Sequence, residues 1–335
     1  MRFGPVPPAQ ALGSILAHSL ELNGTKLRKG LILKQDHLDM MAAADLDHVV
    51  VAQLDADDLH EDAAASRLAH ALVPADTTLR LTEAFTGRVN LLAPGPGVAL
   101  INEDKLNAAN DVNPMITVAT VPAYQQMSQR GMVATVKIIA YGVPAADLEI
   151  ACDRARAAIS FAPSKLRTTT LIVTEIPGGA GEKGVQAIRD RLTLLGVSLS
   201  EVVVVPHAEA PLGNALASAQ TDLTLILTGS ATSDPMDVAP QSVRLAGGQV
   251  ERFGMPVDPG NLLFVGSLND RPVIGLPGCA RSPALNGADW VLSRIVCGLN
   301  VSHSDIARMG VGGLLKEIPT RPMPRQGRRG KAAES

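Results

Sequence analysis

The chain has 335 residues, of which 46% are hydrophobic and 19% charged, and its formal net charge is −3. This composition predicts a globular protein of about two domains. Aromatic residues make up only 2% of the chain, so platforms that stack nucleic-acid bases are not expected, and no basic field is available for phosphate backbones. No apolar stretch reaches ~18 residues without a charge, so no membrane span is expected.

The cysteines and the first residues bear on localisation. Cys152, Cys279 and Cys297 are odd in number and lack metal-ligand spacing, which predicts reduced thiols. Cys279 could act as a metal ligand or nucleophile, although an inert small side chain is the simpler interpretation. The opening sequence has no charged leader followed by a long apolar run, so no signal peptide is expected. A cytoplasmic protein is predicted.

Residues 1–75 predict a small N-terminal α/β module, because apolar side chains recur at helical spacing in some segments and form short runs in others. Pro74 ends its last helix. The predicted helices cover residues 10–22, 36–46 and 58–73, and the predicted strands cover residues 27–33 and 47–54.

Residues 76–166 predict a mixed, β-rich connecting region. Pro94-Gly95-Pro96 indicates a tight turn between two strands. Further apolar runs follow, and the last leads into a helix. The predicted strands cover residues 87–93, 97–101, 116–121, 123–127 and 132–143, and the predicted helix covers residues 145–160.

Residues 167–312 show the clearest pattern, since buried strands alternate with helices. Such alternation predicts βαβ units and a parallel sheet covered on both faces. Ligands of such sheets bind outside the carboxyl ends of the strands, which points to the turns at residues 176–184, 206–209, 228–237 and 275–283. The predicted strands cover residues 168–176, 201–206, 222–229 and 271–278, and the predicted helices cover residues 184–196, 212–221 and 283–299. Residues 317–335 are basic and rich in proline and glycine, so a disordered tail is expected.

The first turn contains Gly179, Gly181 and Gly184, which fit the pattern G-x-G-x-x-G between a strand and a helix. This context favours an anion at a helix N-terminus, although the glycines could simply make a flexible turn. A nicotinamide-dinucleotide site also needs an acid near the end of the second strand. That strand ends in Pro206-His207, which disfavours a dehydrogenase. His207 could contact a ligand or act as an acid or base, and a structural role is equally open.

The third turn is a run of small hydroxyl residues followed by two acids. Short side chains let backbone N–H groups approach a phosphate, and hydroxyl groups add donors. Ser233 or Asp234 could cap the helix that follows. Asp234 and Asp237 could hold a divalent cation there, and a functional role is the favoured interpretation for Asp237. The predicted ligand-binding residues here are Thr228, Gly229, Ser230, Thr232, Ser233 and Asp234.

The fourth turn contains Pro277, Gly278, Arg281 and Ser282. Glycine and proline predict a tight turn, and the guanidinium of Arg281 offers a planar fork for phosphate or carboxylate. Ser282 could be a ligand donor or a helix cap. No Ser/His/Asp order, paired-histidine motif or P-loop pattern is present, so neither a nucleophilic hydrolase nor a nucleotide kinase is indicated, and no metal-ligating residues are predicted.

In their order along the chain, these turns resemble the molybdopterin-binding (MogA/MoeA-type) domain family. Residues 275–283, GLPGCARSP, are similar to a turn of the MoeA-like branch, as are residues 252–278 that lead into it. The N-terminal stretch also resembles the opening of MoeA-like proteins. The corresponding turns are residues 177–184, residues 206–209, and residues 228–232 with Asp237.

The resemblance implies a three-layer α/β/α sandwich with a mostly parallel sheet that binds molybdopterin or its nucleotide adduct. In the family, the MogA branch adenylylates molybdopterin with ATP and Mg²⁺, and the MoeA branch inserts molybdate. Gly229, Ser230 and Thr232 would bind phosphate, and Asp237 would be catalytic. The resemblance further implies a homodimer, with other cofactor-biosynthesis proteins or molybdoenzymes as partners. It is a resemblance to a MoeA-like branch without the C-terminal β domain of full MoeA-type enzymes.

Four residues depart from the family pattern. His207 stands where an aspartate is expected, and Ser230-Ala231 stand where two glycines are usual. Lys183 lies near a position at which the family often has an acidic residue. A more cationic pocket favours phosphate binding over metal-assisted adenylyl transfer. The sequence therefore predicts a molybdopterin-binding protein of molybdenum-cofactor biosynthesis, with molybdate insertion as its candidate reaction. A non-catalytic carrier or sensor and a CinA-like pyridine-nucleotide hydrolase are the alternatives.

Overall fold

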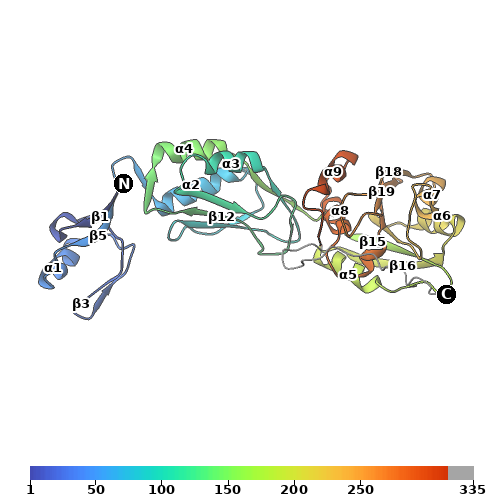
Figure 1. Ribbon diagram of the computed structural model, residues 1–335, viewed down its shortest axis with the longest axis horizontal. Coiled ribbons are helices and arrows are strands. Elements are labelled where there is room, and N and C mark those ends of the chain that lie inside the picture. Colours follow the sequence, from blue (N-terminus) through green and yellow to red (C-terminus); the bar gives the residue numbers. More distant parts are fainter. Residues whose placement is uncertain (316–335) are drawn as a thin grey trace, which may run out of the picture. The chain divides into compact units, whose positions relative to one another are not determined.

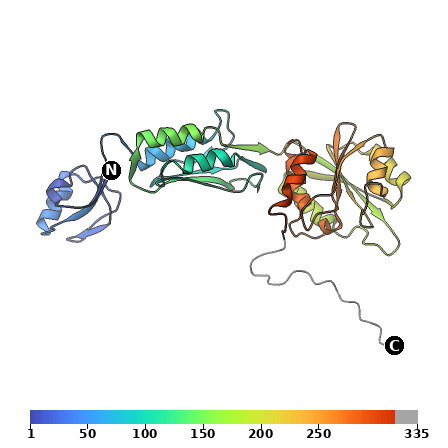
Figure 2. The same ribbon diagram turned by 45° about the horizontal axis from the view of Figure 1, so that its top comes forward.

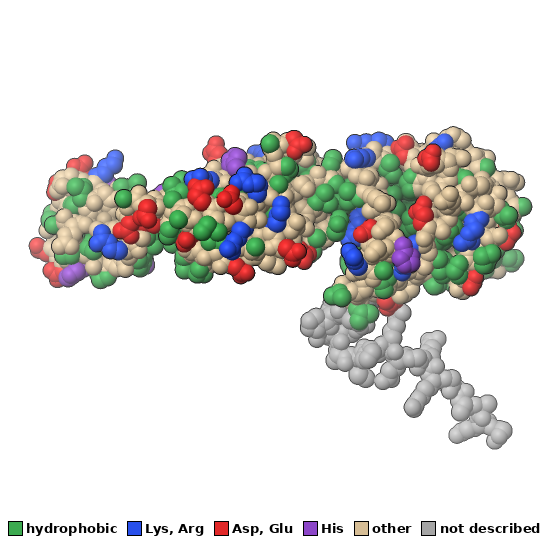
Figure 3. Space-filling view, turned by 90° about the horizontal axis from the view of Figure 1, so that it is seen from above, with side chains coloured by type: hydrophobic (Ala, Val, Ile, Leu, Met, Phe, Trp, Pro, Cys, Tyr) green, Lys and Arg blue, Asp and Glu red, His purple; other side chains and the backbone are tan. Residues whose placement is uncertain are grey.

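The computed structural model describes residues 1–315 and divides the chain into two compact units, Met1–Ala162 and Pro163–Ser335 (Figure 1). The predicted disordered tail, residues 317–335, lies outside the described residues. Each unit has hydrophobic clusters of its own. On the face shown in Figure 3, acidic and basic side chains are interspersed over both units, so neither sign of charge dominates that face.

The first hydrophobic cluster of unit 1 surrounds Leu16, Leu33, Met41 and Val51. Strand β5 lies between β1 and β2 and pairs with both in antiparallel fashion. The helix predicted at residues 10–22 is therefore wrong, because β5 supplies backbone partners to this segment from a distant part of the chain. The elements are β1 (Arg2–Val6), η1 (Pro8–Gln10), β2 (Ile15–Leu16), β3 (Leu20–Leu22), β4 (Thr25–Leu27), α1 (Gln35–Ala43) and β5 (Val49–Gln53).

The second cluster of unit 1 lies between three helices and a four-stranded antiparallel sheet of order β10-β12-β8-β7 (Figure 2). The predicted helix 145–160 ends at Arg154, since Ala157 has a positive φ and Ile159 starts a strand. The helices are α2 (Glu61–Leu72), α3 (Glu103–Asn110) and α4 (Ala145–Arg154). The strands are β6 (Asp58–His60), β7 (Arg80–Leu81), β8 (Arg88–Leu92), β9 (Gly97–Ile101), β10 (Ile116–Thr120), β11 (Gln126–Met127), β12 (Met132–Ile138), β13 (Gly142–Pro144) and β14 (Ile159–Pro163).

Unit 2 is built on a six-stranded sheet of order β16-β15-β17-β20-β19-β18. The first four strands are parallel, and β19 and β18 run antiparallel to their neighbours. The predicted α/β fold with a mostly parallel sheet is thus confirmed. Strands β18 and β19 were not predicted from the sequence. The strands are β15 (Thr168–Glu175), β16 (Ser198–Pro206), β17 (Leu223–Leu227), β18 (Gln249–Phe253), β19 (Phe264–Leu268) and β20 (Arg271–Leu276).

Helices cover both faces of this sheet and make three layers. Successive residues of a strand point to opposite faces, and Leu171 belongs to the cluster under α5, α8 and α9 while Ile172 belongs to the cluster under α6 and α7. The helices are α5 (Val185–Leu194), α6 (Glu209–Ser218), α7 (Val238–Leu245), α8 (Gly287–Val296) and α9 (His303–Ala307), and the 3₁₀ turns are η2 (Gly278–Arg281) and η3 (Arg308–Gly310). Within residues 1–315, no helix combines the length and apolar character that a bilayer crossing requires.

Candidate functional site

Four turns meet at one edge of the sheet of unit 2. Because β15, β16, β17 and β20 are parallel, their carboxyl ends lie at the same edge. Each strand there gives way to a turn that leads into a helix, or, after β20, into η2 and then α8. All the site residues predicted from the sequence lie in these four turns, so the fold gathers them at this edge.

The buried hydroxyl of Thr174, at the end of β15, links two neighbouring turns. The N–H of Gly229 donates to Thr174 Oγ1 over 2.9 Å, and His207 Nδ1 lies 2.8 Å from the same oxygen. A Cβ at Gly229 would lie 2.6 Å from the carbonyl oxygen of Thr174. Glycine is therefore required at position 229 by close backbone packing, and His207 is held in place through one of its two ring nitrogens.

Arg281 joins the first, third and fourth turns. Its Nη1 donates to the carbonyl oxygens of Gly181, at 2.9 Å, and Lys183, and its Nη2 donates to that of Thr228 at 3.0 Å. Burial lowers the pKa of the guanidinium. The group predicted to fork onto a phosphate thus spends three N–H groups on the backbone of its neighbours. Gly184 accommodates it, since a Cβ there would lie 2.6 Å from Arg281 Cα.

Arg191, which the sequence analysis did not single out, fixes the backbone of the fourth turn. Its Nε donates to Asp289 Oδ1 over 2.6 Å, and the side chain is nine-tenths buried. Three further N–H groups donate to the carbonyl oxygens of Ala280, Ser282 and Ala284 at 2.7–3.0 Å, and Nη1 also donates to that of Ala187 in α5 at 3.2 Å. Helical spacing could have revealed it, because Arg191 shares the buried face of α5 with Ala187 and Ile188.

Asp237 is the N-cap of α7. Its Oδ1 accepts from the N–H of Val238 at 2.7 Å, and its Oδ2 accepts from the N–H of Ser233 at 3.0 Å. The expectation that Ser233 or Asp234 caps this helix is wrong, because Asp234 instead accepts from the N–H of Met236 in a turn before the helix. The carboxylate predicted to be catalytic therefore has a structural role in the third turn.

The remaining predicted residues divide into supporting and exposed ones. Thr228 Oγ1 donates to the carbonyl oxygen of Ser230 at 2.6 Å and lies 3.4 Å from Thr232 Oγ1, and both threonines are buried. These hydroxyls therefore brace the turn. Pro277 is also buried, whereas Gly179, Ser230, Ser233, Asp234, Gly278 and Ser282 are exposed.

Two of the four helices at this edge begin without a side-chain cap. The N-cap positions of α5 and α6 are Gly184 and Ala208, and neither helix start receives a side-chain hydrogen bond. By contrast, Asp237 caps α7 and Asn286 caps α8. The first backbone N–H groups of a helix lack partners within the helix and carry its positive dipole end. The starts of α5 and α6 are therefore suited to an anionic ligand group.

The described residues do not supply a ready metal cage. Across residues 1–315, no three His, Cys, Asp or Glu side chains are grouped closely enough to hold one ion. The edge does carry a cation and an imidazole, Lys183 and His207, together with the exposed acids Glu175 and Glu209. Lys183 and the helix starts at this edge are suited to hold an anion such as phosphate.

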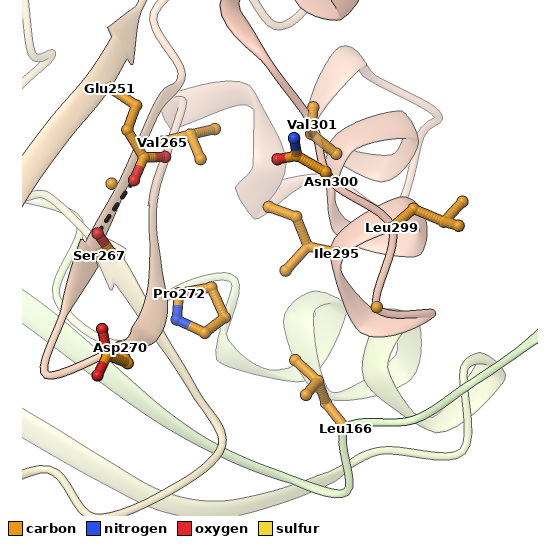
Figure 4. Close-up of a pocket in the computed structure, with 12 residues that line it drawn as sticks. Leu166, Glu251, Val265, Ser267, Asp270, Pro272, Ile295, Leu299, Asn300 and Val301 are labelled. Atoms are coloured by element: carbon orange, nitrogen blue, oxygen red, sulfur yellow. Dashed lines mark hydrogen bonds between the residues drawn. The ribbon is translucent and has the colours of Figure 1, made fainter.

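A separate pocket of about 380 Å³ lies at the opposite edge of the sheet (Figure 4). It is lined by Leu166, just before β15, by Pro272 near the start of β20, and by residues 298–301 beyond the end of α8. None of the predicted site residues lines this pocket. The pocket and the four turns are therefore distinct features of unit 2.

One family model matches part of unit 2. Residues 169–294 match the family model of a probable molybdopterin binding domain. No curated protein matches the chain. The matched range begins in β15 and ends in α8, so it contains all four turns.

Solved structures with low sequence identity were also found. A molybdopterin biosynthesis moea protein from Pyrococcus horikosii is 12% identical, with 89% of this chain and 75% of that chain covered and a TM-score of 0.31. A molybdopterin biosynthesis protein from Mycobacterium abscessus is 16% identical, with 40% of this chain and 92% of that chain covered and a TM-score of 0.28. A molybdopterin biosynthesis Mog protein from Mycobacterium ulcerans is 20% identical, with 45% of this chain and 100% of that chain covered and a TM-score of 0.27.

Proposed function

We propose, from the match of residues 169–294 to the model of a probable molybdopterin binding domain, that this chain binds molybdopterin or its nucleotide form. The ligand would lie at the edge where β15, β16, β17 and β20 end. Its role would be in molybdenum-cofactor biosynthesis. Localisation in the cytoplasm, a homodimer, and hand-over to molybdoenzymes or other biosynthetic proteins remain predictions.

The observation that carries this proposal is the pair of uncapped helix starts. Gly184 and Ala208 leave the first N–H groups of α5 and α6 without side-chain partners at the same edge. A phosphate there would accept from backbone donors that the fold has already oriented. Because these donors belong to the backbone, the site does not depend on the side chains at which this chain departs from the family.

Side chains around the helix starts would complete recognition. Ser230 and Ser233 are exposed in the third turn and can donate to phosphate oxygens. Glu175 and Glu209 are also exposed next to the helix starts, and carboxylates accept from N–H groups such as those of a pterin ring. Phosphate would be held by the helix starts and hydroxyls, and the pterin by acceptors beside them.

The proposal needs no metal held by the protein. Among residues 1–315, no three His, Cys, Asp or Glu side chains are grouped to hold Mg²⁺. Molybdate would be a substrate of the candidate insertion reaction, which is proposed in addition to ligand binding. Asp237, its candidate catalytic residue, already accepts two backbone N–H groups.

Co-purification tests the binding proposal. The chain would be purified from a host that makes molybdopterin, oxidised, and examined for the fluorescent pterin derivative. We expect the derivative in the wild-type protein and at least ~10-fold less in Ala208→Asp, whose carboxylate would occupy the start of α6. Absence of the derivative in wild type, together with no heat of binding on titration with molybdopterin, would refute the proposal.

A further inference from the structure

The four-stranded sheet of unit 1 has one face that no helix covers. Helices α2, α3 and α4 lie on one side of this sheet (Figure 1), and alternate strand residues such as Val89, Leu91 and Val136 are buried against them. The residues between these point to the other side. There Phe85 is 75% exposed and Ile139 is 54% exposed. We call this second side of the sheet the open face.

The open face carries three cations. Arg88 of β8 and Lys137 of β12 are directly opposite each other, and Arg80 of β7 is opposite Leu92 of β8. Residues opposite each other across an antiparallel pair share a face, and like charges placed in this way destabilise the pair. Strands β7, β8, β10 and β12 contain no Asp or Glu. The strands themselves therefore supply positive charge to this face and nothing that opposes it.

The two arginines of the open face lack an acidic partner. Arg88 Nη1 donates to the neutral hydroxyl of Thr135 at 3.2 Å, and among residues 1–315 neither Arg80 nor Arg88 forms an ion pair. Lys137 differs, since its Nζ lies 3.7 Å from a carboxylate oxygen of Glu61 in α2. Both guanidinium groups are exposed and can receive carboxylates in a bidentate geometry.

Apolar side chains lie beside these cations. Phe85 is bridged to Arg88 across a tight turn. Met115 and Ile139 continue the pairing of β10 with β12, because the N–H of Ile139 donates to the carbonyl oxygen of Met115 at 2.8 Å. All three apolar side chains are exposed. Grouped apolar surface next to cations is typical of a site that another molecule covers.

The size of the open face favours a short segment over a second copy of the chain. Strands lie ~4.8 Å apart and rise ~3.4 Å per residue, so four strands and residues 132–139 span about 14 by 24 Å, or roughly 340 Å². Weak and transient protein contacts bury an area of this order, whereas the interface of a stable homodimer is several times larger.

The charge around the open face favours a protein partner over an extended polyanion. Residues 1–162 contain 18 Asp and Glu against 13 Lys and Arg, and Glu83, just after β7, is one of the exposed acids. A nucleic acid or an anionic membrane reaches beyond the face and meets this negative charge, which repels it. A segment with a few carboxylates and apolar side chains matches the face alone.

We propose that the open face binds a short acidic segment of another protein. Its carboxylates would pair with Arg80 and Arg88, and its apolar side chains would pack on Phe85, Met115 and Ile139. Arg80 is opposite the residue four places beyond Arg88 in β8, and residues four apart in an extended segment lie on one side, about 14 Å from each other. The inference is independent of the proposed function, because this sheet lies outside residues 169–294.

Binding of a designed peptide tests the proposal. The probe is a fluorescein-labelled, end-capped peptide, Leu-Ser-Leu-Ser-Glu-Ser-Ser-Ser-Glu, whose leucines and glutamates share one side when it is extended. Fluorescence anisotropy would give its dissociation constant for the full chain and for Arg80→Gln/Arg88→Gln, the face variant. We expect binding about 5-fold weaker in the face variant, as the loss of two exposed ion pairs predicts. The matched control, Arg28→Gln/Lys29→Gln, neutralises two exposed cations elsewhere in unit 1 and should bind as wild type does.

Two further measurements examine each half of the recognition. A peptide with glutamine in place of both glutamates should bind wild type about 5-fold more weakly, and the face variant should not distinguish the two peptides. Phe85→Ser, which removes the most exposed apolar side chain of the face, should also weaken binding of the acidic peptide. Circular dichroism confirms that each variant is folded before affinities are compared.

Each outcome decides the proposal. Weaker binding in the face variant and in Phe85→Ser, with the control unchanged, supports it. No binding to wild type, or equal affinities in all the proteins, overturns it. Self-association of wild type in sedimentation velocity that Phe85→Ser abolishes also overturns it, because the face would then hold a second copy. Binding to phosphatidylserine vesicles that the face variant loses, without peptide binding, overturns it in favour of a membrane.

Discussion

Thr174 and His207 are hydrogen-bonded over 2.8 Å, and the same threonine oxygen accepts from the N–H of Gly229. With one lone pair engaged by Gly229, the hydroxyl proton is available to donate to His207 Nδ1. In that arrangement Nδ1 of His207 accepts a hydrogen bond, and Nε2 is the ring nitrogen that can bond to other groups. A residue buried in the sheet thus determines which hydrogen-bonding group His207 presents at the strand edge.

Removing the Thr174 hydroxyl should disturb both neighbours. We expect Thr174→Val to lower the free energy of unfolding by about 1–3 kcal/mol, because the Gly229 N–H loses its buried acceptor. Urea denaturation measures this change, and ¹⁵N NMR of the imidazole would show a shift in the His207 tautomer. Thr174→Ser, which retains the hydroxyl, should recover most of the lost stability and most of the wild-type ¹⁵N signal of His207. Wild-type behaviour of the valine variant would show that the hydroxyl is dispensable.

Substitutions at Ala208 separate helix capping from ligand charge. Aspartate and asparagine cap helices about equally well, each worth about 1 kcal/mol relative to alanine. Both Ala208→Asp and Ala208→Asn should therefore raise the melting temperature. We expect affinity for pyrophosphate, measured by calorimetry, to fall at least ~10-fold in the aspartate variant, since its charge opposes the ligand in addition to occupying the N–H groups.

The asparagine variant provides the control for charge. It should lose less affinity than Ala208→Asp, because its cap is uncharged. Lys34→Asn, at the start of α1 in unit 1, where the N–H of Lys34 donates to His37 Nδ1, is a control away from the site and should leave the affinity unchanged. Unchanged pyrophosphate binding in both Ala208 variants would place the anion away from α6.

Arg191 should matter for stability well beyond a surface arginine. Arg191→Met would leave Asp289 and three turn carbonyl oxygens without their donor. Breaking a buried ion pair from one side costs about 3–5 kcal/mol, so a loss near the lower figure is expected in chemical denaturation. Arg189→Met is the matched control, because Arg189 is exposed on the same helix. Equal losses in the two variants would contradict the role assigned to Arg191.

The Asp222 carboxylate should make the stability of the fold depend on pH. The backbone N–H groups of Arg167 and Thr168 donate to its Oδ2 and hold its pKa below the ordinary value of 3.8. A carboxyl with a depressed pKa stabilises the fold above its unfolded pKa and loses that contribution as pH falls through the folded value. The stability advantage of wild type over Asp222→Asn should therefore be constant from pH 7 to about pH 5 and shrink below pH 3.8. A constant difference down to pH 2.5 would contradict this.

Asp237 can be tested for a role beyond its cap. Asp237→Ala should lower the free energy of unfolding by about 1 kcal/mol, and Asp237→Asn should recover most of that loss, because asparagine also caps. We expect both variants to retain molybdopterin binding. Loss of cofactor synthesis in the asparagine variant, with binding intact, would assign the carboxylate a chemical role in addition.

The four parallel strands of unit 2 were predictable because their signals are local. Residues 168–174 are an unbroken run of threonine and apolar residues, and the helices between strands show clear apolar faces. The segment Ile15–Leu16 was not predictable, since its strand conformation depends on pairing with Val51 and Ala52. Its apolar spacing is compatible with a helix as well as with short strands.

The position of the site was predictable, whereas the roles of its residues were not. Parallel topology alone brings the four turns together. Whether Arg281 faces a ligand or the backbone depends on where Gly181 and Thr228 lie relative to it. Similarly, Asp237 became the cap because α7 begins at Val238, a boundary that sequence patterns locate only to within a few residues.

The hydrogen bonds of Arg281 have a consequence for how this edge can change during evolution. All three acceptors are main-chain carbonyl oxygens, so a substitution at Lys183 or Thr228 does not remove them. The exposed side chains at Ala180, Ser230 and Ala231 make none of these three bonds. New ligand preferences can therefore arise by mutation of the turn side chains while Arg281 keeps the turns at a constant spacing, and a library randomised at these exposed positions should yield a high proportion of folded variants.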